Sequence, residues 1–251
     1  MLLLVVASSV RGSAAHSSMA NEQEKEAAAR DSLRFVHDGD VVGLGTGSTS
    51  LFLIRLLGER VKAGLKIRGI PTSGRTRDTA LAAGIELTTF ERDPVIDVAI
   101  DGADEIGPGL ELIKGGGGAL LREKIVASAA RKFVVIADSS KQVAVLGKFP
   151  LPVEVVPFAE ALIAHRIGGL GASVTLRKDA QGKPFVTDEG HHILDCLFGQ
   201  IPDPVVLAIE LSRMPGIVEH GLFLDMADVA LIGKGDQVLE IPRFQKHARS
   251  V

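Results

Sequence analysis

The chain has 251 residues and contains three short segments in which glycines stand beside charged or hydroxyl side chains. The first is Asp101-Gly102-Ala103-Asp104-Glu105, which directly follows the apolar run 95–100. Ligands of open α/β sheets bind at the carboxyl ends of the strands. Carboxylates at this position could hold sugar hydroxyls or a metal ion, although a helix cap or a solvated acidic turn would give the same pattern.

The second segment is Lys114-Gly115-Gly116-Gly117-Gly118, with Arg122-Glu123-Lys124 shortly after it. Four successive glycines are costly in conformational entropy, so they are expected where backbone N–H groups must come close to a ligand. A helix is predicted to follow them, and the N-terminus of a helix favours an anion. The alternatives are a flexible linker for the glycines and an ordinary solvated helix carboxylate for Glu123.

The third segment is Gly43-Leu44-Gly45-Thr46-Gly47-Ser48-Thr49. It lacks the third glycine of a dinucleotide-binding fingerprint and the lysine of a Walker A loop. What remains is a turn between a strand and a helix, with N–H groups and hydroxyls suited to a phosphate. A tight turn without a ligand is the alternative.

Composition excludes several other chemistries. The chain has no Tyr, which excludes the Tyr-x-x-x-Lys relay of short-chain dehydrogenases, and no Trp. With a net charge of −3 it has no electrostatic footprint for nucleic acid. Its single cysteine, Cys196, excludes an intrachain disulfide and a cysteine-based metal site. The neighbouring His191 and His192 point to opposite faces of a strand, so we predict no catalytic metal.

The elements that must position these segments alternate between strands and helices. Strands are expected at 41–44, 66–70, 86–89, 95–100, 110–113 and 133–137, and helices at 21–37 (capped by Asn21), 48–57, 76–83 and 119–130. This alternation predicts the α/β class, with a doubly wound, Rossmann-like parallel sheet.

The pattern changes after residue 147. Strands are expected at 153–156, 173–177, 192–197 and 217–218, and helices at 159–167 and 204–212. This β-α-β-β-α-β order is ferredoxin-like, and the apolar run 227–232 suits the middle of the first sheet. We therefore predict a Rossmann-like domain of residues 21–147 and 222–245, with a ferredoxin-like α+β domain of residues 148–221 inserted in it.

Residues 1–20 form a separate segment. Their apolar run 2–7 is far shorter than the ~20 residues that span a bilayer, and the basic start of a secretory signal is missing. We expect a disordered leader, or an upstream start with the working start at Met19. Together with the single cysteine, this predicts a cytoplasmic protein that does not bind membranes.

The chain resembles type A ribose-5-phosphate isomerases. The matching segments, in the family's order, are GLGTGST (43–49), DGADEI (101–106), KGGGGALLREKI (114–125), ADSSKQV (137–143), GKFPLPVEV (147–155) and ADVALIG (227–233). The resemblance covers the chain from about Glu24 to Gln237. It also implies a two-domain fold with a ferredoxin-like insertion.

The resemblance implies an aldose–ketose isomerase that interconverts D-ribose 5-phosphate and D-ribulose 5-phosphate through an enediolate, in the non-oxidative branch of the pentose phosphate pathway. It implies a homodimer or homotetramer, and a reaction that needs no metal or cofactor. The family's proton-transfer base falls on Glu123, with Asp101, Asp104 and Lys114 as the other catalytic residues. The implied substrate-binding residues are Lys25, Thr46, Gly47, Ser48, Thr49, Gly102, Ala103, Gly115, Gly116, Gly117 and Lys141.

Two other functions share related folds. One is a non-catalytic sugar-phosphate-sensing domain of a transcription regulator, but residues 1–40 offer one helix and no helix-turn-helix. The other is a coenzyme A transferase or an amino-sugar-phosphate deaminase. The glutamate of Arg122-Glu123-Lys124 and the paired aspartates Asp101 and Asp104 argue against both enzymes.

Overall fold

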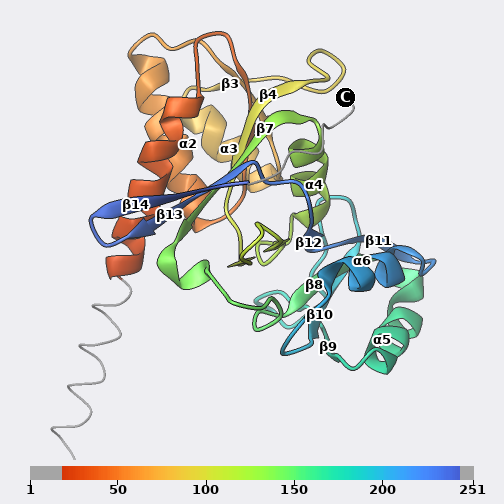
Figure 1. The fold of residues 1–251 in the computed structure, drawn as a ribbon. Coiled ribbons are helices and arrows are strands. Elements are labelled where there is room, and N and C mark those ends of the chain that lie inside the picture. Colours follow the sequence, from red (N-terminus) through yellow and green to blue (C-terminus); the bar gives the residue numbers. More distant parts are fainter. Residues whose placement is uncertain (1–18, 244–251) are drawn as a thin grey trace, which may run out of the picture.

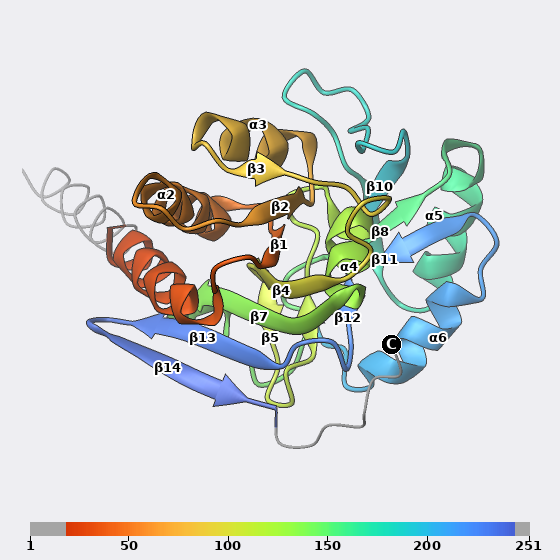
Figure 2. The ribbon, with the colours of Figure 1, turned by 90° about the horizontal axis from the view of Figure 1, so that it is seen from above.

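The computed structural model describes residues 19–243, and its main feature is a seven-stranded sheet (Figure 1). The strand order is β14-β13-β7-β4-β1-β2-β3 (Figure 2). Neighbouring strands are parallel except for the antiparallel pair β13 and β14. The strands are β1 (Val41–Leu44), β2 (Arg68–Pro71), β3 (Glu86–Leu87), β4 (Ile96–Asp101), β7 (Ala130–Asp138), β13 (Val229–Lys234) and β14 (Gln237–Pro242).

Both faces of this sheet are covered, as in doubly wound proteins. Successive strand residues point to opposite faces. Val134 of β7 packs in the cluster that contains Leu53 of α2 (Ser48–Lys62). Its neighbour Val135 packs in the cluster that contains Val126 of α4 (Leu120–Ser128). The predicted Rossmann-like α/β class is confirmed.

The order of the strands determines where a ligand can bind. From β1 the chain passes through α2 to β2 and through α3 (Gly74–Ala82) to β3, and then returns to β4 on the other side of β1. Loops that leave β1 and β4 in opposite directions create a crevice at their carboxyl ends. The chain segments that follow β1, β4 and β7 all begin at this edge of the sheet.

A second sheet has four antiparallel strands in the order β11-β8-β10-β9 (Figure 1). Two helices accompany it, α5 (Glu160–Gly169) and α6 (Pro204–Ser212). The strands are β8 (Leu151–Val155), β9 (Ser173–Leu176), β10 (His192–Leu197) and β11 (Ile217–His220). This is the predicted ferredoxin-like arrangement, with its own apolar cluster. The domain boundaries at 147 and 222 remain a prediction.

A small three-stranded sheet joins the two parts. Its order is β12-β6-β5, from β12 (Leu222–Phe223), β6 (Leu112–Ile113) and β5 (Glu105–Ile106). Beside it, the buried carboxylate of Glu105 accepts hydrogen bonds from the N–H groups of Gly147 and Phe149, at 2.7 and 2.6 Å. Glu105 therefore ties the start of the 148–221 segment to the small sheet. Three single-turn helices are η1 (Leu33–Phe35), η2 (Ser139–Lys141) and η3 (Pro157–Ala159).

Some local predictions were wrong. The N-terminal helix spans residues 19–32, so Asn21 lies inside it and does not cap it. Residues 19 and 20 of the predicted leader are thus helical, while residues 1–18 and 244–245 lie outside the described chain. Helix α2 extends to Lys62, beyond its predicted end at residue 57. A Cβ on Gly58 would lie 2.8 Å from the Ala83 Cβ. This glycine permits close helix packing and does not end the helix.

Strand β13 lies next to the edge of the main sheet and not at its centre, because β14 is the edge strand beyond it. Strand β14 was not predicted, since its half-exposed sequence QVLEIP lacks the long apolar run of an inner strand. None of the helices within residues 19–243 has the length and apolar character needed to cross a membrane.

Candidate active site

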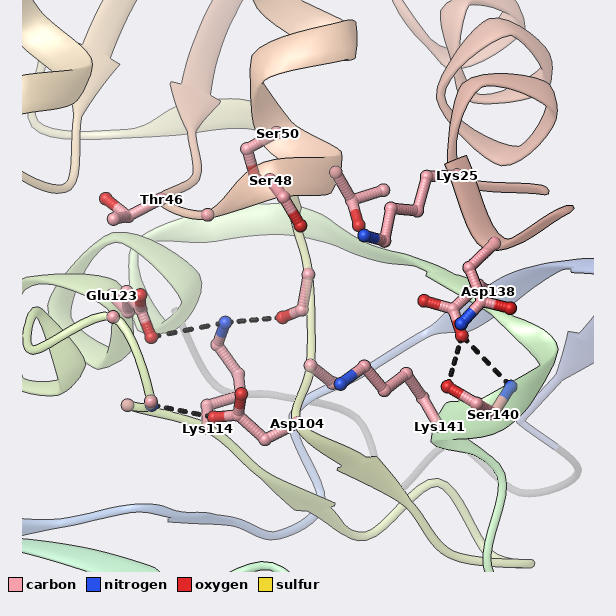
Figure 3. Close-up of a pocket in the computed structure, with 18 residues that line it drawn as sticks. Lys25, Thr46, Ser48, Ser50, Asp104, Lys114, Glu123, Asp138, Ser140 and Lys141 are labelled. Carbon is pink, nitrogen blue, oxygen red and sulfur yellow. Dashed lines mark hydrogen bonds and ion pairs between the residues drawn. The ribbon is translucent and has the colours of Figure 1, made fainter. Parts of the chain in front are cut away.

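A pocket of about 200 Å³ lies at the carboxyl ends of β1, β4 and β7 (Figure 3). It is lined by Asn21, Lys25, Thr46, Gly47, Ser48, Thr49, Ser50, Gly102, Ala103, Asp104, Lys114, Gly115, Gly116, Gly117, Glu123, Asp138, Ser140 and Lys141. The structure therefore brings together every predicted site residue except Asp101. That side chain is 4% exposed and lies behind the pocket wall.

Asp101 is the last residue of β4, and several donors surround its carboxylate. It accepts hydrogen bonds from the N–H groups of Thr46 and Gly102, at 3.0 and 2.7 Å, and from the Ser50 hydroxyl at 3.3 Å. Its Oδ2 lies 2.9 Å from Lys114 Nζ. Gly45 leaves room for this carboxylate, because a Cβ at position 45 would lie 2.1 Å from Asp101 Oδ1. Asp101 is therefore placed to orient Lys114 and the turn after β1.

Lys114 follows β6 and is 2% exposed. Its Nζ donates to the Gly102 carbonyl at 2.5 Å and lies 3.2 Å from Glu123 Oε2 (Figure 3). Burial opposes a charge on this amine, but the carboxylates of Asp101 and Glu123 outweigh it and raise its pKa above the usual range. Lys114 is thus a buried, fixed positive charge.

Glu123 lies in the first turn of α4 and is 3% exposed. Its Oε2 lies at ion-pair distance from Lys114, yet it is a buried oxygen without a hydrogen bond among the described residues. Burial raises the pKa of Glu123 to about 8, against the attraction of Lys114 and with the support of the negative charge on Asp101. A carboxylate that lines a pocket and has a pKa near neutrality is suited to general acid–base catalysis.

The glycine loop 115–118 connects Lys114 to α4. The N–H of Gly116 donates to Asp104 Oδ2 at 2.7 Å (Figure 3). A Cβ on Gly116 would lie 2.6 Å from Asp104 Oδ1, so only glycine allows this approach. Gly115 has a φ of +103°, which other residues rarely adopt. The loop therefore presents backbone to the pocket where a side chain would block it.

The other end of the pocket is basic. Lys25 and Lys141 lie on the side opposite Glu123 (Figure 3), together with the N-terminus of α2 at Ser48 and Thr49. Lys25 makes an ion pair with Glu22 at 2.7 Å. Two lysines and a helix N-terminus suit an anionic group such as a phosphate. The pocket thus has two lysines at one end and the buried carboxyl of Glu123 at the other.

A family model described as ribose 5-phosphate isomerase A (phosphoriboisomerase A) matches residues 68–237. This match covers more than half of the chain. The chain belongs to the ribose 5-phosphate isomerase A family. The resemblance seen in its motifs is confirmed, and the chain is an enzyme of this family.

Two curated members of the ribose 5-phosphate isomerase A family are about half identical to the chain. The Parvibaculum lavamentivorans protein is 50% identical over 229 residues, which cover 88% of this chain and 99% of that protein. The Sphingopyxis alaskensis protein is 51% identical over 215 residues, covering 86% and 94%.

Two solved structures agree with the fold. A D-ribose-5-phosphate isomerase in complex with phospho-erythronic acid has a TM-score of 0.87 and 40% identity, covering 89% of this chain and 99% of that chain. The ribose 5-phosphate isomerase A of Methanocaldococcus jannaschii has a TM-score of 0.83 and 40% identity, covering 87% and 97%.

Sequence reasoning missed several residues that shape this ribose 5-phosphate isomerase A pocket. Asn21, Ser50, Asp138 and Ser140 line it. The hydroxyl of Thr46 lies within hydrogen-bond distance of Thr72, Ser73 and Thr76, at 2.8, 2.9 and 3.0 Å. These contacts join residues far apart in the sequence, so no local pattern could have revealed them.

Glu24 was not among the predicted site residues. In the structure its buried carboxylate accepts from the Ser139 N–H at 2.9 Å and the Gly235 N–H at 2.8 Å. Burial opposes its ionisation, but these hydrogen bonds outweigh it and lower its pKa. Glu24 thus holds the helix that carries Lys25 against the turn that carries Lys141.

Proposed function

We propose that the enzyme interconverts D-ribose 5-phosphate and D-ribulose 5-phosphate through an enediolate, with Glu123 as the base. The observation that carries this proposal is the buried Glu123 carboxyl, which lines the pocket, has a raised pKa and lies beside the fixed charge of Lys114. Membership of the family and the basic end of the pocket support the choice of substrate.

In the proposed reaction the ionised Glu123 removes the proton from C2 of the open-chain aldose. The electron pair of that C–H bond forms the C1–C2 double bond, and the carbonyl π pair moves to O1. A proton moves from the C2 hydroxyl to O1, and O2 becomes the carbonyl as Glu123 delivers its proton to C1. The atoms and electrons balance, and the base is restored.

Negative charge develops on the sugar oxygens during this transfer. Lys114 and the N–H groups of the glycine loop are the proposed partners of this charge. A preorganised donor of this kind is typically worth about 2.7–4 kcal/mol in the transition state. Asp104 lines the pocket and would hold a sugar hydroxyl and assist opening of the furanose ring. Asp101 lies behind the wall, so we assign it the orientation of Lys114.

The phosphate would lie at the basic end, held by Lys25, Lys141, Ser48 and Thr49. Binding there fixes the orientation of carbons that lie several bonds away. The proposed reaction uses protein groups alone, without a metal or cofactor. A cytoplasmic location and a homodimer or homotetramer remain predictions.

The test is conversion of ribose 5-phosphate in deuterated water. We expect ribulose 5-phosphate to form and to carry deuterium at C1 after many turnovers, because a proton held by Glu123 exchanges with solvent. A product free of deuterium would contradict transfer through a protein base. Failure of the wild-type enzyme to convert ribose 5-phosphate would contradict the proposed substrate.

We expect kcat/KM to increase with pH and to level off above about 8, where Glu123 is ionised. The base must be ionised to accept a proton, so kcat/KM should fall roughly tenfold for each pH unit below this value. The measurement is kcat/KM between about pH 6.5 and 9.5, above the substrate phosphate's own titration near pH ~6. A flat profile over this range would contradict the role of Glu123.

Replacement of Lys25 by methionine is expected to raise KM about tenfold, because a charge-assisted contact to phosphate is lost. The value of kcat should stay within about twofold, since binding remote from the reacting carbons is removed equally from ground and transition states. Steady-state kinetics measure both. Arg30→Met is the control, since Arg30 lies on the same helix with a side chain 61% exposed. An unchanged KM for Lys25→Met would remove Lys25 from the phosphate site.

A further inference from the structure

One contact links the four-stranded sheet to the glycine loop of the pocket. Arg177 directly follows β9, and its backbone pairs with β10 through a hydrogen bond from its N–H to the Ile193 carbonyl at 2.8 Å. Its Nη1 donates to the carbonyl oxygens of Gly115 and Gly116, at 2.9 and 3.2 Å. The guanidinium of Arg177, beside the four-stranded sheet, therefore contacts the backbone of the glycine loop. That loop lines the pocket at the edge of the seven-stranded sheet.

The guanidinium is itself fixed by Asp195 of β10. Arg177 Nε donates to Asp195 Oδ2 at 2.9 Å, and Nη2 donates to Oδ1. Such a bidentate pair holds the guanidinium plane in one orientation. The two side chains are 14% and 25% exposed. Asp195 offsets the charge of Arg177, so the pair adds little net electrostatic field at the pocket. Its main effect is to fix the direction in which the Arg177 N–H groups point.

The direction of these donors sets the direction of the loop's own N–H groups. In a planar trans peptide the C=O and the N–H point to opposite sides. The carbonyls of Gly115 and Gly116 point to Arg177, so the N–H groups of Gly116 and Gly117 point away from it. The Gly116 N–H donates to the carboxylate of Asp104, a residue of the pocket wall. Gly117 itself lines the pocket.

A glycine loop needs such an external restraint. Without Cβ atoms, its peptides can adopt φ and ψ values closed to other residues, and a peptide that turned over would present a carbonyl oxygen where a donor is required. An oxygen aimed at a developing negative charge would repel it. The Nη1 group of Arg177 holds two successive carbonyls on the far side of the loop.

We propose that Arg177, held by Asp195, is a positioning residue that fixes the peptides of the glycine loop, so that the Gly116 N–H holds the Asp104 carboxylate and the Gly117 N–H faces the enediolate. The inference rests on the proposed function, because it assigns the Gly117 N–H to the charge that develops on the substrate. It makes the four-stranded sheet a contributor to catalysis through the backbone of the loop.

The test compares Arg177→Met and Arg177→Lys with Arg68→Met. Arg68 is a matched control, because it makes the same bidentate pair with Asp93, at 2.9 and 2.9 Å, and does not line the pocket. We expect Arg177→Met to lower kcat roughly 10–100-fold, less than the about 10²–10³-fold cost of deleting a whole donor. KM should stay within about threefold. Arg177→Lys should recover part of kcat, and Arg68→Met should keep wild-type kcat.

Binding of phospho-erythronic acid gives a second readout. Its planar carboxylate stands in for the enediolate oxygens, so its affinity should fall with kcat in Arg177→Met and stay unchanged in Arg68→Met. Amide hydrogen exchange gives a third readout that does not depend on turnover. The N–H groups of Gly116 and Gly117 should exchange faster in Arg177→Met, while melting temperatures correct for any general loss of stability.

Wild-type kcat in Arg177→Met, or unchanged exchange of both amides, would overturn the proposal. A higher KM with normal kcat would also overturn it, because it would assign Arg177 to substrate binding. The wild type and Glu123→Gln are assayed alongside. If the wild type is active and Glu123→Gln is not, a negative result for Arg177 leaves the proposed function intact. A wild type inactive on ribose 5-phosphate would overturn both proposals.

Discussion

Replacement of Glu123 by glutamine is expected to lower kcat roughly 10²–10⁴-fold while KM changes little. Glutamine keeps the size of the side chain but cannot accept a proton at the pH of the assay. The contacts at the phosphate end do not involve this residue, so substrate should still bind. A coupled assay with ribose 5-phosphate measures both constants. Turnover near the wild-type level would remove Glu123 from its role.

Glu154→Gln is the matched control. Glu154 is as deeply buried, at 1% exposed, but it lies on β8 and bonds to Thr187 and His191, at 2.9 and 3.0 Å. Its replacement should reduce stability without lowering kcat. A comparable loss of kcat in Glu154→Gln would show that replacing any buried carboxylate by an amide disturbs the active site.

Glu123→Gln should also be more stable than the wild type, increasingly so as pH rises from about 4.5 to about 8. Burial raises the pKa of Glu123 in the folded state, so in this window the unfolded chain releases the proton first and the wild type loses stability. Below the window the carboxyl is protonated in both states, and the two proteins should differ little. Because the chain has no Trp or Tyr, circular dichroism or calorimetry is the suitable measurement.

Replacement of Lys114 by methionine is expected to have the second large effect. It removes the proposed partner of the enediolate charge, so kcat/KM should fall about 10²–10³-fold. It also leaves Asp101 and Glu123 buried without their cation, which typically costs about 3–5 kcal/mol of stability. The loss of stability should shrink at acidic pH, where both carboxyls take up protons. Steady-state kinetics, and thermal melts at pH values on either side of the Glu123 pKa of about 8, measure the two effects.

Lys124→Met is the control for the loss of a buried lysine. Lys124 Nζ lies 2.7 Å from Glu219, its side chain is 15% exposed, and it does not line the pocket. This variant should lose stability but keep kcat within a few-fold of the wild type. If Lys114→Met lost no more activity than this control, Lys114 would be a structural residue only.

The strands and helices were largely predictable because their patterns are local. The buried strand at Val41–Leu44, the glycine-rich turn after it and the helix from Ser48 onward follow from an apolar run, a cluster of glycines and helical periodicity. The edge strand β14 was missed because an exposed edge carries no comparable apolar run.

The glycines of GLGTG show a different limit. Sequence reasoning assigned the turn that contains them to the binding of a phosphate. In the structure a Cβ on Gly43 would lie 2.5 Å from Val126 Cγ1, and one on Gly45 would meet Asp101. These two glycines allow neighbouring elements to pack closely. A sequence shows that a side chain is missing, but it does not show which neighbour occupies the space.

The sequence by itself determined the kinds of side chain available, the loops that carry them and the strands that end beside them, because these depend on patterns within a few residues. Only the tertiary structure separated the surroundings of Glu123, which lines the pocket and has a raised pKa, from those of Asp101, the carboxylate bound behind Lys114. It alone brought Arg177 and Asp195 behind the glycine loop. The reason is physical: burial, charge and orientation depend on groups that the fold brings together from distant parts of the chain.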